Sequence, residues 1–249
     1  MGEIMPPEIS PYLAEFIGTM LLILFGDGVV ANAILSRTKG HASGWIVITT
    51  GWAMAVTIGV YASFWVSGGH INPAVTIALA AMGSFPWSMV PGYIVSQFLG
   101  AFVGAILVYL AYMDHFRETT DKAAKLGVFS TIPQIRSIPK NFLTEVIGTF
   151  ALVLGVMAIT APKSGVPQGL IPVVVGFLVW GIGLSLGGPT GYAIKPARDL
   201  GPRLAHQLLP IPGKGSSDWS YAVVVPLFGP IIGGLLGALV WRLYTAPLG

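Results

Sequence analysis

Two turns of similar sequence hold the residues of this chain that could do chemistry. Residues 68–80 read GGHINPAVTIALA, and residues 191–203 read GYAIKPARDLGPR. The first turn has Asn72 before its proline, and the second has Lys195 in the same place. An amide and an ammonium group both donate hydrogen bonds. The paired turns therefore predict a site that presents donors to a small polar molecule.

The composition is that of a membrane protein. Of 249 residues, 54% are hydrophobic and only 9% are charged, whereas a soluble domain has about 25% charged residues. The chain has no cysteine, which excludes a disulfide framework and a thiolate metal site. The net charge of +3 is small and the basic residues do not form one run. We therefore expect a lipid bilayer, and not a nucleic acid, as the partner of this chain.

Six stretches are long enough to cross a membrane, and two are too short. A helix that spans roughly 30 Å of hydrocarbon needs about 20 apolar residues. The six long stretches are about 12–34, 45–66, 90–112, 142–161, 169–187 and 220–244. The short apolar segments 72–82 and 196–208 each contain a proline at or near their start, which suits the first position of a helix. We expect half-helices that begin at Pro73 and Pro196.

The sequence contains an internal repeat. EFIGT from Glu15 matches EVIGT from Glu145 at an offset of 130, and Asn72 matches Lys195 at an offset of 123. Each half holds three spans and one half-helix, and an odd number of spans inserts the halves in opposite orientations. The predicted organisation is one channel domain, 1–249, in three parts: repeat one (1–112), a solvated linking loop (113–141) and repeat two (142–249).

Broken helices at matching positions of two halves indicate a transport path. Irregular backbone at that depth is tolerated only where it is buried or lines a water-filled cavity. Two half-helices that point their N-termini at one place each present roughly +0.5 charge there. Such a field repels cations, and neutral molecules pass by exchanging hydrogen bonds with the wall.

The whole chain resembles the major intrinsic proteins, the family of aquaporins and glycerol facilitators. The resemblance rests on SGGHINPAVT (67–76) and PARDLGP (196–202), each in the expected half. It implies an all-α membrane protein with six transmembrane helices plus two half-helices in two inverted repeats, the aquaporin fold. It also implies a pore centre formed by Asn72, Pro73, Ala74, Lys195, Pro196 and Ala197.

The resemblance further implies a selectivity filter of four residues: Trp52, Gly183, Tyr192 and Arg198. A water-selective member would typically have His in place of Gly183 and Phe in place of Trp52. Here two aromatic walls and the donors of Arg198 suit the carbons and hydroxyls of a polyol. An arginine in a membrane segment marks a pathway by default. Trp52 could instead anchor the chain at the lipid interface, and Gly183 could serve helix packing.

Three further residues are expected to support the turns. By resemblance, Glu15 and Glu145 hold the turn backbones through hydrogen bonds. His70 is expected to be a buried hydrogen-bonding residue and not a metal ligand, since no second histidine or carboxylate stands at ligand spacing. We expect no metal and no cofactor. Asp27 fits a packing role and a pore role equally well.

We therefore expect a multi-pass channel of the cell membrane that passes glycerol, water and other small neutral solutes and excludes ions and protons. The alternatives are a water-selective channel and a channel for small protonated acids such as lactic acid. An ion-coupled transporter would need buried carboxylates free to bind sodium or protons. No nucleophile–base pair is visible, so the chain is not expected to be an enzyme.

Two features depart from the simple picture or rest on resemblance alone. The family has asparagine where this chain has Lys195, whose charge costs roughly 2.5–3.5 kcal/mol at mid-membrane. The family orientation places both termini in the cytoplasm, whereas the basic residues of loops 35–44 and 113–141 favour the opposite orientation. A homotetramer is expected from the resemblance, and Gly100 and Gly104 allow close helix packing within or between subunits.

Overall fold

The computed structural model describes residues 10–246, so both ends of the predicted channel domain (1–9 and 247–249) lie outside the described residues. The chain is all-α, and with the short turns that lead into them its six long helices are apolar enough to cross a membrane. These helices are α1 (Pro11–Ile34), α2 (Trp45–Ser67), α4 (Val90–Glu118), α6 (Ile138–Thr160), α7 (Ile171–Leu186) and α10 (Val225–Thr245). The predicted spans are thereby confirmed.

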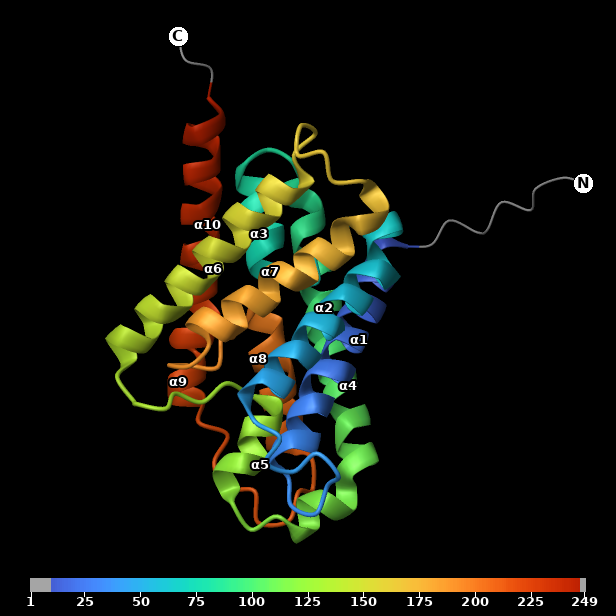
Figure 1. Ribbon diagram of the computed structural model, residues 1–249, viewed down its shortest axis with the longest axis vertical. Helices are drawn as coiled ribbons and strands as arrows, with labels where there is room; N and C mark the ends of the chain where they lie inside the picture. Colours follow the sequence, from blue (N-terminus) through green and yellow to red (C-terminus); the bar gives the residue numbers. More distant parts are fainter. Residues whose placement is uncertain (1–9, 247–249) are drawn as a thin grey trace, which may run out of the picture.

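Two half-helices complete the inverted repeats. They are α3 (Pro73–Ala81) and α8 (Pro196–Leu208), and both begin at the predicted proline. Short helical turns lie between the longer elements: η1 (Trp87–Met89), α5 (Lys122–Phe129), η2 (Gln168–Leu170) and α9 (Trp219–Ala222). Because the number of spans is even, the start of α1 and the end of α10 lie toward the same end of the molecule (Figure 1).

The two halves interlock through their half-helices. Helix α1 packs against α2 and α4, and α6 packs in the same way against α7 and α10. Each half-helix then lies against the last helix of the other half, α3 against α10 and α8 against α4. The N-termini of α3 and α8 are therefore held in the middle of the bundle, where neither half alone could place both.

Glycines allow the helices that carry the half-helices to approach closely. A Cβ atom on Gly100 of α4 would lie 2.3 Å from the carbonyl oxygen of Phe16 on α1. A Cβ atom on Gly233 of α10 would lie 2.2 Å from the carbonyl oxygen of Val146 on α6. Val146 follows Phe16 at the repeat offset of 130, so both halves use the same contact. Gly100 thus packs within the chain.

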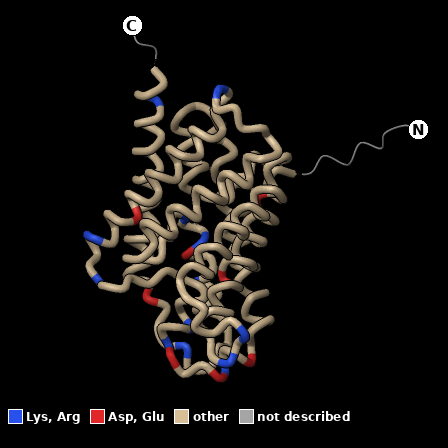
Figure 2. Tube along the Cα trace, in the orientation of Figure 1, with Lys and Arg blue, Asp and Glu red and all other residues tan. Residues whose placement is uncertain are grey.

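The segment expected to be a solvated linking loop is partly helical and buried. Helix α4 continues to Glu118, past Tyr112, whose φ of −118° and ψ of 17° mark a kink. Helix α5 then buries Phe129 completely and stacks it on Phe116, with ring centroids 5.3 Å apart. The apolar residues of this segment lie between charged residues in the sequence, and the sequence therefore predicted a loop. Charged residues gather at this end of the molecule, away from the termini (Figure 2).

Replacing Gly100 with alanine should destabilise the bundle, because the added methyl group must displace backbone of α1. Overpacking of this kind costs about 1–3 kcal/mol. The matched control is Gly28→Ala, since a Cβ atom there meets nothing within 4 Å. Thermal unfolding in detergent should show a lower midpoint for Gly100→Ala only. Equal midpoints for the two variants would contradict the close contact between α1 and α4.

Candidate functional site

The first turn is held by a buried carboxylate on α1. One oxygen of Glu15 accepts from the backbone N–H of His70 (2.9 Å) and from the hydroxyl of Ser67 (2.6 Å). The other oxygen accepts from the N–H of Ile71 and from the amide of Gln97, both at 2.7 Å. Glu15 is fully buried. The carboxylate therefore satisfies backbone donors that have no partner within a helix.

The second turn repeats this arrangement with Glu145 on α6. Its carboxylate accepts from the N–H groups of Ala193 (3.0 Å) and Ile194 (2.8 Å) and from the hydroxyl of Thr190 (2.7 Å). These three partners follow His70, Ile71 and Ser67 at the offset of 123. Both glutamates thus bind the same three positions of the two turns, and Glu15 accepts one further bond from Gln97.

The carboxylates fix an unusual backbone conformation. Ile71 and Ile194, which precede Asn72 and Lys195, have φ values of 40° and 44°. A positive φ is rare for a β-branched residue and persists only where surrounding structure imposes it. The two turns therefore share one strained backbone conformation at equivalent positions.

Asn72 joins the two turns directly. Its side-chain oxygen accepts from the N–H of Ala74 at 2.9 Å, which caps α3. Its side-chain nitrogen donates to the carbonyl of Ile194 in the opposite turn at 2.9 Å. An amide nitrogen has two hydrogens, so Asn72 has one more to offer. Pro73, Ala74, Pro196 and Ala197 are all buried at this junction.

Lys195 lies beside Asn72 and lines the same small cavity. This cavity of about 50 Å³ is also lined by His70 and Val75. Only 5% of Lys195 is exposed, and among residues 10–246 its ammonium group has no hydrogen-bond partner. The side chain therefore shares this cavity with Asn72 and His70. His70 itself contacts the hydroxyl of Thr76 through Nδ1 at 3.1 Å.

Arg198 and Trp52 come together on the other side of the junction. The guanidinium carbon of Arg198 lies 3.9 Å from the centroid of the Trp52 ring. Trp52 is 3% exposed and its ring packs on Gly26, where a Cβ atom would lie 2.2 Å away. Trp52 is thus buried inside the bundle and does not face lipid. Asp27, which follows Gly26, lies 3.6 Å from Arg198.

Gly183 makes room for Tyr192. A Cβ atom on Gly183 would lie 2.9 Å from the Tyr192 ring and 3.0 Å from its hydroxyl. The carbonyl of Gly183 accepts from the indole N–H of Trp45 at 3.0 Å, and the ring of Trp45 meets that of Tyr192 edge to face. The space beside the glycine is therefore filled by an aromatic ring that belongs to the second turn.

Trp52, Tyr192 and Arg198 all line a second, larger cavity of about 580 Å³. Its mouth is formed by loop residues such as Gln134 and Gly188. The two cavities lie on either side of the Asn72–Lys195 junction. The arrangement can guide a small molecule between aromatic faces and a guanidinium, and then past the donors of the two turns.

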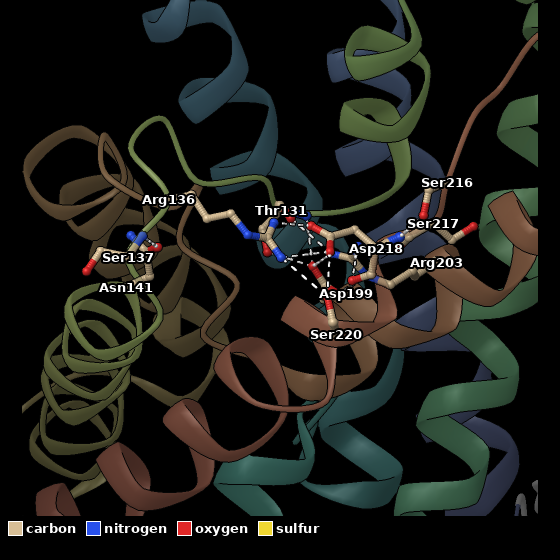
Figure 3. Close-up of polar contacts among 10 residues, drawn as sticks. All are labelled: Thr131, Arg136, Ser137, Asn141, Asp199, Arg203, Ser216, Ser217, Asp218 and Ser220. Atoms are coloured by element: carbon tan, nitrogen blue, oxygen red, sulfur yellow. Dashed lines mark hydrogen bonds and ion pairs between the residues drawn. The ribbon is translucent and has the colours of Figure 1, made fainter.

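A buried ion pair anchors α8 next to the arginine. The Asp199 carboxylate accepts from the N–H and hydroxyl of Thr131 (2.8 and 2.6 Å) and pairs with Arg203 at 2.7 Å (Figure 3). Arg203 in turn donates to the carbonyls of Thr131 and Ser217. Both charges are fully buried and fully bonded. The network fixes the first turn of α8, and so the place of Arg198, against two loops.

A second ion pair joins the two loops at the surface. Arg136 donates to both oxygens of Asp218, at 2.5 and 3.0 Å (Figure 3). These hydrogen bonds hold the pKa of the Asp218 carboxyl below its ordinary value. The ion pair is partly exposed, so it positions the loop and contributes little stability.

Some site residues were not found from the sequence. Trp45 stands seven residues before Trp52, which places both on one face of α2, and this spacing could have identified it. The pair Asp199 and Arg203 stands at the i, i+4 spacing of a helical ion pair. No local sequence pattern indicates the role of Thr131, because its contact with Asp199 depends on how the segment 119–137 folds back.

The fold and the site define a class of protein: a membrane channel whose path runs between two opposed half-helices. The family model described as Major intrinsic protein matches residues 6–241. The chain belongs to the major intrinsic protein family. It is accordingly a multi-pass membrane protein of a family of channels, not of enzymes.

Relatives and a solved structure agree with this assignment. The chain is 66% identical over 234 residues to the probable glycerol uptake facilitator protein of Thermotoga maritima, covering 94% of this chain and 99% of that one. It is 55% identical to the glycerol uptake facilitator protein of Bacillus subtilis, covering 94% and 84%. The X-ray structure of the aquaglyceroporin from Plasmodium falciparum superposes with a TM-score of 0.85 at 30% identity, covering 95% and 96%.

The Glu145→Gln variant should lose stability and conduction, because an amide NH2 group cannot accept the bonds that one carboxylate oxygen accepts. Hydrogen bonds to a charged group contribute about 1.5–3 kcal/mol each. Glu118→Gln is the matched control, since Glu118 pairs with Arg37 at the surface. Thermal unfolding and glycerol flux should both fall for Glu145→Gln and stay unchanged for the control. A Glu145→Gln variant as stable as the parent would contradict the role of the carboxylate.

Proposed function

We propose that the chain is a passive channel for glycerol and other small neutral solutes, together with water, that excludes ions and protons. The observation that carries the proposal is the meeting of Trp52, Tyr192 and Arg198 at one cavity. Two aromatic faces suit the carbon backbone of a polyol, and the guanidinium suits its hydroxyls. The relatives named above are glycerol uptake facilitators, which supports the same solute.

Selection happens in two places along the proposed path. Trp52, Gly183, Tyr192 and Arg198 form the filter, and Gly183 contributes by letting the Tyr192 ring withdraw against α7. Asn72 and Lys195 then offer donors at the pore centre, where both half-helices begin. The positive ends of the two helix dipoles oppose cations, including hydronium. A neutral solute exchanges hydrogen bonds at each place and needs no coupled ion.

Lys195 takes the position that asparagine holds in the family, and we propose that it slows conduction. Its four-carbon stem lines the small cavity beside Asn72, where a neutral solute has to pass. Its ammonium adds positive charge to the two half-helix ends and strengthens the exclusion of cations.

The organisation of the chain is part of the proposal. Repeat one (1–112) and repeat two (142–249) together form a single channel domain, with 113–141 as the link. Four copies assemble as a homotetramer with one path in each subunit, as the family resemblance implies.

Solute flux into proteoliposomes tests the proposed function. Vesicles that contain the protein should shrink and then quickly re-swell in a glycerol gradient, and should only shrink in an impermeant osmolyte. Re-swelling no faster than that of empty vesicles, with fast water loss, would identify a water-selective channel instead. Entry of lactic acid at acidic pH without entry of glycerol would identify a channel for protonated acids.

Substituting Gly183 should reduce glycerol flux by pushing Tyr192 into the path. Gly183→His should lower glycerol permeability about tenfold or more while water permeability changes much less, as expected when a polar side chain narrows a filter. Gly183→Ala and Gly181→Ala form a matched pair on α7, since a Cβ atom at 181 meets nothing within 4 Å. Only the first should lower glycerol flux. Equal loss of glycerol and water flux in Gly183→His would count against the filter.

Replacing Lys195 with asparagine should speed the passage of neutral solutes, because it removes a long charged side chain from the pore centre. We expect glycerol permeability to rise several-fold, on the order of the flux changes that single pore residues cause. The control is Lys163→Asn in an exposed loop. The measurement is paired glycerol and water permeability at equal protein density. A lysine form that conducts as fast as the asparagine form would contradict the proposed obstruction.

A further inference from the structure

We propose that Asp27 is the counter-charge and the positioning residue of Arg198. This inference rests on the proposed function, in which Arg198 belongs to the filter. It deepens that function by assigning the orientation and the net charge of the filter to a residue on α1. Asp27 does not line the larger cavity, so it acts through Arg198 and not on the solute.

Asp27 is buried and has no other partner. Its side chain is 0% exposed, and Oδ1 lies 3.6 Å from Nη1 of Arg198. Within residues 10–246, neither carboxylate oxygen accepts a hydrogen bond, and Nη1 of Arg198 donates none. A buried charge without a partner is costly, so buried charges occur in pairs. The two side chains therefore compensate each other.

The other carboxylates near α8 are already engaged. Asp199 pairs with Arg203 and accepts two bonds from Thr131. Glu145 is used by the second turn. This leaves Asp27 as the partner for Arg198. The negative charge of Asp27 also offsets part of the positive charge of the second turn, where Lys195 stands three residues before Arg198.

The internal repeat provides a comparison for this pair within the chain. The offset of 130 between α1 and α6 takes Asp27 to Met157, and the offset of 123 between the half-helices takes Arg198 to Val75. Met157 and Val75 are both buried and belong to the same apolar cluster. Each pair joins the two repeats: the charged pair takes Asp27 from repeat one and Arg198 from repeat two, and its equivalent takes Met157 from repeat two and Val75 from repeat one. The aspartate therefore occurs only at the one of these two equivalent places that also has the arginine.

The pair explains how Arg198 is held beside Trp52. The guanidinium lies on the Trp52 ring at 3.9 Å, and the ring rests on Gly26, next to Asp27. Attraction to Asp27 keeps the guanidinium against α1 and α2 and out of the path. Since the pair is neutral overall, the filter can donate hydrogen bonds to hydroxyls without becoming a binding site for anions.

The test uses proteoliposomes and compares glycerol and water permeability in Asp27→Asn, Arg198→Val and the double variant Asp27→Met/Arg198→Val. The double variant copies the Met157–Val75 pair. Thr149→Val is the control, because it removes a fully buried polar group that bonds only within α6. Thermal unfolding in detergent is measured for every variant.

We expect Asp27→Asn to lower the ratio of glycerol to water permeability about fivefold or more, because an unpaired guanidinium turns toward water in the path. The control should leave the ratio unchanged. Arg198→Val, which leaves the carboxylate unpaired, should unfold at a lower temperature than the double variant. A double variant that is more stable than one of its single variants is expected of a charge pair and not of two independent residues.

The outcomes separate this inference from the proposed function. If Arg198→Val leaves the permeability ratio unchanged, the filter itself is wrongly assigned. If Arg198→Val changes the ratio and Asp27→Asn does not, the filter stands and the role of Asp27 is overturned. A double variant no more stable than Arg198→Val would also overturn the pairing.

Discussion

The structure depends on two buried carboxylates that bind backbone N–H groups in the middle of the bundle. Each turn that precedes a half-helix leaves backbone N–H groups without a partner deep in the membrane. An unsatisfied polar group at that depth costs several kcal/mol. Glu15 and Glu145 accept those donors and hold Ile71 and Ile194 at positive φ. Without them the two half-helices could not begin at one point in the middle of the bundle.

On this symmetric frame the chain places its charges asymmetrically. Lys195, Arg198, Asp199 and Arg203 all belong to the second turn and α8, whereas the first turn and α3 carry no Lys, Arg, Asp or Glu. The carboxylates of Asp27 and Asp199 lie around α8 and compensate part of that charge. In the proposed function, the frame sets where a solute passes, and the charges around α8 set which solute passes.

Much of the fold could be predicted from local signals. Apolar length identified the six spans, and Pro73 and Pro196 marked the starts of the half-helices, because both signals act within a few residues. The buried helix α5 could not be predicted, since its apolar residues are few and their burial depends on distant loops. The Tyr192 ring occupies the space beside Gly183. Sequence spacing alone cannot show which side chain fills a gap.

The central claim is that glycerol passes between Trp52, Tyr192 and Arg198. The most direct test is an experimental structure of the protein in lipid, determined with glycerol present. We predict a glycerol molecule in the larger cavity, with its carbons against the rings of Trp52 and Tyr192 and its hydroxyls bonded to Arg198. An empty filter, with glycerol bound only outside the path between the two half-helices, would contradict the account.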